Sequence, residues 1–242
     1  MSRLILIRHA QASFSPDPEK AFEDYDRLSR LGYLQAEALG EELVAAGVVF
    51  DRVYTGPAAR QRQTAEAVGA VYARQRRAWP ELRTEEGLAE HQGAAVVRMA
   101  LAEADYEHER ARLGDGATRP DDATRAYFTV FQRVTRSWAR GELREPHGAE
   151  SWQSFRARVQ AGVRRIMTES GRGATVAAFT SGGPIGSTVA HVLGLDDERA
   201  IELAWAVDNT TLTELLFTEE RVSLKSFNAQ PRTGAAELVT HV

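Results

Sequence analysis

The stretch RLILI, residues 3–7, is a short run of Leu and Ile that ends directly at Arg8 and His9. Continuous aliphatic runs of this length are typical of a strand that is buried on both faces, as in a sheet covered by helices. Residues 174–180, ATVAAFT, form another run of this kind, and residues 52–55, RVYT, form a shorter one. These runs alternate along the chain with helical patterns, so the sequence predicts an α/β fold with a mostly parallel sheet.

Two of the predicted helices lie between the first strands. A helix is expected from Ser29, a favourable N-cap residue, to Gly47, which would stop it. A turn at Gly56-Pro57 follows the strand at 52–55, and a second helix then runs to about Tyr72, with Pro57 in its first turn. Helices in these positions would cover the predicted sheet.

Three further elements are expected in the C-terminal half. A helix begins near Trp152 and ends at Gly171. The glycine turn SGGP, residues 181–184, precedes another helix, and residues 211–217 and 221–227 are predicted as a closing pair of strands.

Residues 94–146 follow a different pattern, in which a polar break separates two helical stretches. The stretch GDGATRPDD, residues 114–122, reads as a loop. After it, apolar residues recur at helical spacing, and these are Tyr127, Val130, Phe131, Val134 and Trp138. We therefore expect one domain over residues 1–242, a three-layer α/β/α sandwich that carries a helical cap insertion at 94–146.

The composition narrows the class of protein. The chain has 242 residues, a net charge of −4 and no Cys, which excludes disulfides, thiolate catalysis and Cys-based metal sites. The acidic balance disfavours nucleic-acid binding. The apolar run at 4–7 is too short for a signal peptide or a membrane helix. We expect a soluble, cytoplasmic protein without a nucleic-acid or membrane partner, and an exposed apolar helix face could support a homodimer.

Candidate chemistry gathers where two predicted strands end. Arg8 and His9 follow the first strand, and residues 180–183, TSGG, follow a later one. Ligands of parallel sheets bind beyond the carboxyl ends of the strands, so both segments should meet at one edge. A guanidinium can fork onto phosphate oxygens, and an imidazole can attack phosphorus. An isolated Arg-His pair is more often an ordinary strand terminus, so the pair needs support from other motifs.

Support comes from an ordered set of motifs that resembles the histidine phosphatase superfamily, also called the phosphoglycerate mutase-like family. Residues 4–13, LILIRHAQAS, resemble its first strand and RHG signature, with Ala10 where glycine is usual. Residues 54–68, YTGPAARQRQTAEAV, are similar to its SSPLLRARQTAEAV segment. Four further stretches resemble the family in the right order, and these are LSRLGYLQAEALGEEL at 28–43, GLAEHQG at 87–93, GAESWQSFRARV at 148–159 and DNTTLTEL at 208–215.

The resemblance implies a phosphomonoester hydrolase that needs no metal or other cofactor and acts on a small phosphorylated metabolite or related phosphate ester. His9 would be the nucleophile that forms a phosphohistidine, and Arg8 and Arg60 would hold the phosphate oxygens. Glu90 would be the general acid and base. Glu85 or Glu86 would replace it if the alignment slips. The substrate-binding residues implied in this way are Gln11, Ser13, Ser181 and Gly182.

The sequence departs from the family at Ser181, which stands where a segment like VVSHGG has a second histidine. A hydroxyl can donate one hydrogen bond but carries no positive charge. Serine and the backbone N–H groups of Gly182 and Gly183 could replace the histidine, or another side chain such as His91 could be recruited. The remaining alternatives are a protein that only binds phosphate compounds and a phosphoglycerate mutase-type phosphotransferase. Retention of both the nucleophile and the acid favours hydrolysis.

Overall fold

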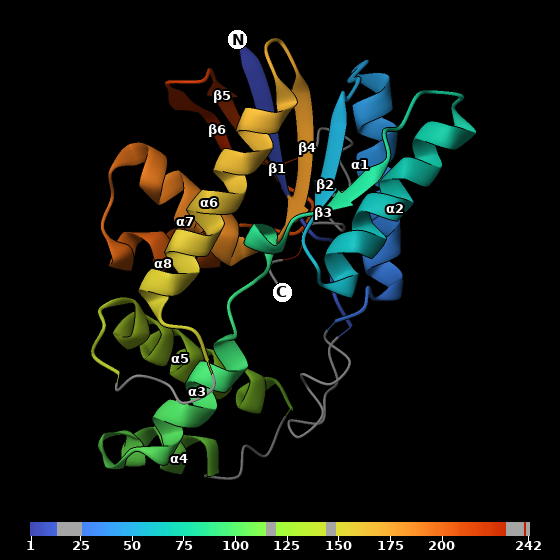
Figure 1. Ribbon diagram of the computed structural model, residues 1–242. Coiled ribbons are helices and arrows are strands. Elements are labelled where there is room, and N and C mark those ends of the chain that lie inside the picture. Colours follow the sequence, from blue (N-terminus) through green and yellow to red (C-terminus); the bar gives the residue numbers. More distant parts are fainter. Residues whose placement is uncertain (14–25, 115–119, 144–148, 231–239, 241–242) are drawn as a thin grey trace. The chain divides into compact units, whose positions relative to one another are not determined.

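The structure is a computed structural model that describes residues 1–13, 26–114, 120–143, 149–230 and 240 (Figure 1). The chain forms two compact units. One consists of residues 1–90 together with 158–242, and the other of residues 91–157 between them. Residues 94–146, which the sequence analysis assigns to an insertion, fall within the second unit.

A six-stranded mixed sheet forms the middle of the first unit, in the order β3-β2-β4-β1-β5-β6. The strands β3, β2, β4 and β1 pair with one another in parallel, whereas β5 pairs antiparallel with both β1 and β6. The predicted parallel core and closing strand pair are therefore confirmed, and β3 is an edge strand that the sequence analysis missed. The strands are β1 (Ser2–Arg8), β2 (Arg52–Thr55), β3 (Leu82–Thr84), β4 (Thr175–Thr180), β5 (Leu212–Phe217) and β6 (Val222–Ala229).

Helices α1 (Arg30–Ala45) and α2 (Ala59–Arg74) cover one face of this sheet (Figure 1). Their buried side chains form one hydrophobic cluster with side chains of β1, β2 and β4. Ser29 caps α1 as predicted, because its side chain accepts the Gly32 N–H. The expected place of Pro57 is wrong, since α2 has Ala58 as its N-cap and Pro57 precedes that residue.

On the opposite face lie α7 (Gly182–Leu193), α8 (Asp197–Ala206) and the part of α6 (Trp152–Ser170) from Arg158 onward (Figure 1). A Cβ on Gly186 would lie 2.5 Å from the backbone nitrogen of Ala204, so glycine allows α7 and α8 to pack closely. The expected glycine turn at 181–184 is wrong, because residues 182–184 already form the first turn of α7. With helices on both faces, the three-layer α/β/α architecture is confirmed.

The second unit is helical. It contains α3 (Gly93–Ala102), α4 (Glu107–Gly114), α5 (Pro120–Ala139) and the first residues of α6. The predicted apolar stripe lies on α5, where Val130, Val134 and Trp138 are buried. The loop expected at 114–122 is wrong at both ends, since residue 114 belongs to α4 and residues 120–122 belong to α5. Residues 115–119 lie outside the described part. No helix in the described residues combines the length and apolarity that a membrane crossing needs.

Candidate active site

The ends of β1 and β4 form the edge of the sheet at which the site residues gather. In the parallel register Arg8 lies opposite Thr180, so the residues that follow them, His9 and Ser181, leave neighbouring strands side by side. The His9 backbone N–H donates to Thr180 O at 2.8 Å. The topology therefore brings the two predicted segments together.

His9 is buried, with 2% of its surface exposed. Its Nδ1 lies 2.8 Å from the backbone oxygen of Ala10, and Arg60 Nε lies 3.1 Å from its Nε2. A carbonyl only accepts and a guanidinium only donates, so these contacts assign the proton to Nδ1 and a lone pair to Nε2. Burial, and then the charges of Arg60 and Arg8, hold the pKa of His9 well below its usual value. The imidazole is therefore neutral at neutral pH.

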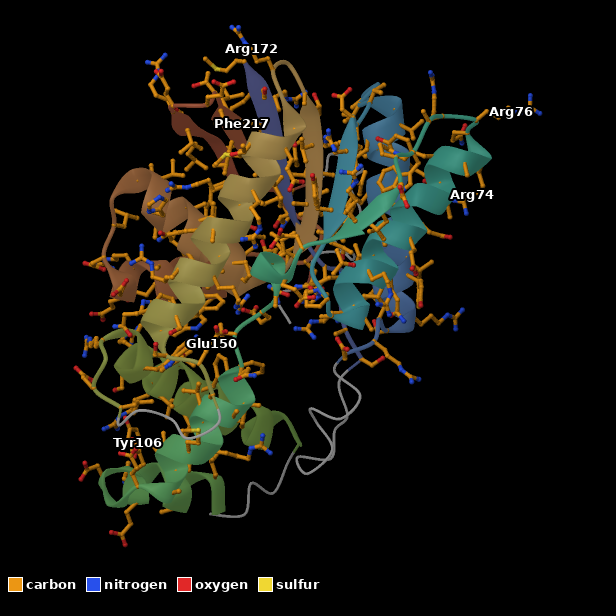
Figure 2. All side chains as sticks on the ribbon, in the orientation of Figure 1. Arg74, Arg76, Tyr106, Glu150, Arg172 and Phe217 are labelled. Atoms are coloured by element: carbon orange, nitrogen blue, oxygen red, sulfur yellow. The ribbon has the colours of Figure 1, made fainter. Side chains whose placement is uncertain are left out.

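Two arginines supply positive charge beside this imidazole. Arg60 comes from the first turn of α2, and its Nη1 lies 3.0 Å from Asp26 Oδ1. Arg8 ends β1 and donates through Nη1 to the backbone oxygen of Val207. The Arg60 side chain is 11% exposed. By contrast, Arg74 and Arg76 point outward at the other end of α2 (Figure 2). Arg60 therefore does not belong to a solvated basic face.

The end of β4 contributes neutral hydrogen-bonding groups. Ser181 is fully buried and is the N-cap residue of α7, but its hydroxyl does not cap the helix. Glu90 Oε2 instead accepts the Gly183 N–H at 3.2 Å. Gln61 Nε2 donates to Ser181 Oγ at 2.8 Å. First-turn amides of a helix favour anions, so Gly182 and Gly183 lie where a phosphoryl oxygen could bind.

The three candidate acids occupy different surroundings. Glu90 reaches the start of α7. Glu85 instead pairs with Arg165 of α6 at 2.5 Å and accepts the Gly87 N–H at 2.8 Å. The hydrogen bond from Arg165 lowers the pKa of Glu85. Glu86 is exposed. Of the three candidate acids, Glu90 is therefore the one that contacts the Gly183 N–H beside Ser181, and Glu85 and Glu86 lie elsewhere.

Gln11 and Ser13 lie on the loop after His9, where their side chains bond to the segment that begins α1. Ser29 Oγ donates to Gln11 Oε1 at 2.8 Å, and Ser13 Oγ donates to the backbone oxygen of Leu28 at 3.3 Å. Both side chains therefore hold the loop against α1.

His91, the alternative to Ser181, belongs to the second unit. Its ring packs among aromatic side chains of that unit, with ring centroids 5.4 Å from Trp138 and 5.6 Å from Phe155. In this packing His91 is part of an aromatic cluster.

Sequence reasoning missed the polar residues whose hydrogen bonds hold the backbone of His9 in place. Asn209 Nδ2 donates to the backbone oxygen of His9 at 2.8 Å, and Thr240 Oγ1 donates to Asn209 Oδ1 at 2.9 Å. Gln35 Nε2 donates to Thr240 Oγ1 at 2.8 Å, while its Oε1 accepts the Gln11 N–H at 2.7 Å. Asn209 lies in the DNTTLTEL motif, but Gln35 and Thr240 carry no local signal, since only the fold brings them together.

A family model matches most of the chain. The model of the histidine phosphatase superfamily (branch 1) matches residues 4–136 and 115–230. The chain therefore belongs to the histidine phosphatase superfamily. Membership supports a phosphatase-type activity for this chain. No curated protein matches its sequence.

Solved structures share the fold over almost the whole chain. The YhfR protein of Bacillus stearothermophilus aligns with a TM-score of 0.66 and 19% identity, covering 97% of this chain and 100% of YhfR. A mutant phosphoserine phosphatase of Entamoeba histolytica, solved in complex with phosphoserine, aligns with a TM-score of 0.63 and 16% identity, covering 96% of this chain and 99% of the phosphatase. The mycobacterial glucosyl-3-phosphoglycerate phosphatase aligns with a TM-score of 0.58 and 22% identity, covering 94% of this chain and 99% of that phosphatase. At these identities the likeness establishes the fold.

Proposed function

We propose that this chain is a metal-independent phosphomonoester hydrolase that acts through a phosphohistidine at His9 on a small phosphorylated metabolite or related phosphate ester. The observation that carries the proposal is a buried, neutral imidazole whose Nε2 lone pair faces the guanidinium of Arg60. A neutral imidazole is the nucleophilic form, and an adjacent cation is what a transferring phosphoryl group needs.

In the first half of the reaction, His9 Nε2 attacks phosphorus and the bond from phosphorus to the ester oxygen breaks. Arg60 would exchange its hydrogen bond with Nε2 for one with a phosphoryl oxygen, and Arg8 would bind a second oxygen. The carboxyl group of Glu90 gives its proton to the departing alkoxide, so the alcohol leaves neutral. The product of this half is the alcohol and phosphorylated His9.

In the second half, water attacks the phosphorus of phosphohistidine. The Glu90 carboxylate takes a proton from that water, and the bond between phosphorus and Nε2 breaks. Inorganic phosphate leaves, and His9 returns to the neutral form with its lone pair on Nε2. Charge is offset throughout by the two guanidinium groups, so the scheme needs no metal ion.

Hydrolysis of p-nitrophenyl phosphate in the presence of EDTA, by the wild type and by His9→Ala, tests the proposal. We expect turnover that survives the chelator and falls by more than about 10³-fold in the variant, because the nucleophile is lost. If wild type and His9→Ala are equally inactive across a panel of phosphate esters while inorganic phosphate still binds, the protein is a phosphate-binding protein and hydrolysis is refuted.

A further inference from the structure

Gln61 is a fully buried amide of α2 that the scheme above does not use. Its Oε1 accepts the Ala58 N–H at 3.2 Å, and its Nε2 donates to the backbone oxygen of Leu88 at 3.1 Å. A backbone N–H can only donate and a carbonyl can only accept, so these two contacts determine which end of the amide is which. The NH₂ group therefore faces Ser181, and Ser181 Oγ accepts from it.

The role of Ser181 as an acceptor leaves its hydroxyl proton for another partner. In ordinary N-caps the serine oxygen also accepts, from an amide in the first helical turn. Here Glu90 has taken the Gly183 N–H, and the next residue of the turn, Pro184, has no N–H. Within the part of the chain that the structure describes, Gln61 is the only hydrogen-bond partner of Ser181 Oγ, and it donates.

From this geometry we infer that Gln61 is a positioning residue, which makes Ser181 a hydrogen-bond donor to the phosphoryl group. The inference rests on the proposed function, because a phosphoryl oxygen is the acceptor that the reaction brings to this edge. A buried hydroxyl proton without a partner is costly, so an arriving anion gains this proton together with the Gly182 N–H at the start of α7.

The two positions also differ together from the family motif. The segment SSPLLRARQTAEAV has alanine where this chain has Gln61, and the segment VVSHGG has histidine where it has Ser181. In the rotamer of Ser181, a histidine Cγ would take the place of Oγ, 2.8 Å from Gln61 Nε2. Contact between such atoms is favourable only near ~3.5 Å, so a histidine in that rotamer would clash with Gln61. The pair thus forms a substitute for the second histidine in which a neutral hydroxyl is oriented by a neutral amide.

A double-mutant cycle on kcat for p-nitrophenyl phosphate tests the inference. Ser181→Ala is expected to lower kcat about 10²-fold, the usual effect of losing one oriented donor. Gln61→Glu keeps the shape of the side chain but replaces the NH₂ group by a carboxylate oxygen, which accepts hydrogen bonds. The Ser181 hydroxyl would then donate its proton to the introduced carboxylate and not to the phosphoryl group, and kcat should fall by a similar factor. In the Ser181→Ala background Gln61→Glu should then lower kcat clearly less, because only the lost hydrogen bond to the backbone oxygen of Leu88 remains to be felt. Equal losses in both backgrounds, or no loss with Ser181 present, would overturn the inference.

The matched control is Gln63→Glu, two residues along the same helix. Gln63 Oε1 accepts the Leu28 N–H at 2.9 Å, and a carboxylate can do the same, so kcat should stay at the wild-type value. The Gln61→Met variant, which lacks both polar groups, repeats the cycle if Gln61→Glu fails to fold.

Replacement by the family residues gives a second, independent test. Ser181→His alone should be poorly active because of the clash with Gln61, whereas Gln61→Ala combined with Ser181→His should be at least about tenfold more active than Ser181→His. If the single variant matches the double variant, the inference is overturned.

Comparison of the wild type with His9→Ala distinguishes failure of this inference from failure of the proposed function. When the wild type turns over and His9→Ala does not, a negative result at Gln61 refutes only the positioning role, and an inactive wild type refutes both.

Discussion

At the end of β1 the chain presents charge and a nucleophile, whereas at the end of β4 it presents only neutral groups. Arg8, His9 and Arg60 form the first region, in which a buried imidazole lies against a guanidinium. Ser181 and Gln61 form the second, in which a hydroxyl accepts from an amide beside the first turn of α7. The two regions adjoin through the hydrogen bond from the His9 N–H to Thr180.

The difference shows that the two regions are held by different kinds of restraint. Burial, and then the permanent charges of Arg60 and Arg8, lower the pKa of His9 whichever way a nearby hydroxyl turns, so the β1 end depends mainly on which residues are present. A neutral hydroxyl is useful only when its proton points at the ligand, so the β4 end depends on the exact hydrogen-bond order of Gln61 and Ser181. Substitutions that preserve shape should therefore be most revealing at the β4 end.

The largest expected effect is that of Glu90→Gln, which removes the carboxyl group proposed as the general acid. Hydrolysis of an alkyl phosphate such as glycerol phosphate should fall about 10²–10⁴-fold. Hydrolysis of p-nitrophenyl phosphate should fall much less, because nitrophenolate leaves without a proton. Steady-state kinetics with both substrates measures this ratio, and equal losses would contradict the role of Glu90. The control is Glu85→Gln, which breaks the pair with Arg165 and should leave the ratio unchanged.

At the β1 end, Arg60→Ala should lower kcat/KM about 10²–10³-fold through the loss of one charged donor. It should also move the pH profile. Because Arg60 helps to lower the pKa of His9, the wild type keeps its neutral nucleophile below pH 6.5, and activity declines only at lower pH. Without Arg60 the pKa of His9 rises, so the acid limb of kcat/KM should shift to higher pH. The substrate ionises identically for both proteins, and an unshifted limb would contradict the proposed electrostatics.

The smallest effect is expected for Asp26→Asn. Asp26 pairs with Arg60, but its side chain is 55% exposed, so the interaction is strongly screened. Release of Arg60 should lower the KM for p-nitrophenyl phosphate by less than about threefold at low salt. The difference should vanish at high ionic strength, where the wild-type pair is already weakened. A higher KM in the variant would mean that Asp26 helps to orient Arg60 for the substrate.

The contrast between the regions also explains what could be predicted from the sequence. Local patterns sufficed for the parallel core, for the Ser29 cap of α1 and for the juxtaposition of His9 with Ser181. Residues 82–84 gave no strand signal, because this three-residue edge strand is largely exposed and lacks an apolar pattern.

Functional positioning at the β4 end required the fold. The start of α2 at Ala59 determines that Gln61 points its amide at Ser181, which follows it by 120 residues in the chain. Likewise, Arg165 pairs with Glu85 and so distinguishes it from Glu90, which contacts the start of α7. No sequence pattern links Arg165 to Glu85. Such contacts between distant polar side chains have no periodicity from which they could be inferred.

The central claim is that His9 carries the phosphoryl group, and direct trapping of that species tests it. Wild-type protein mixed with a phosphate ester and quenched in alkali, which preserves phosphohistidine, should yield one phosphorylated peptide with the modification on His9. The species should form and decay at rates that match turnover, and it should accumulate in Glu90→Gln when an aryl phosphate is used. Steady turnover with no phosphorylated His9 at any time point, or phosphorylation on another residue, would contradict the account.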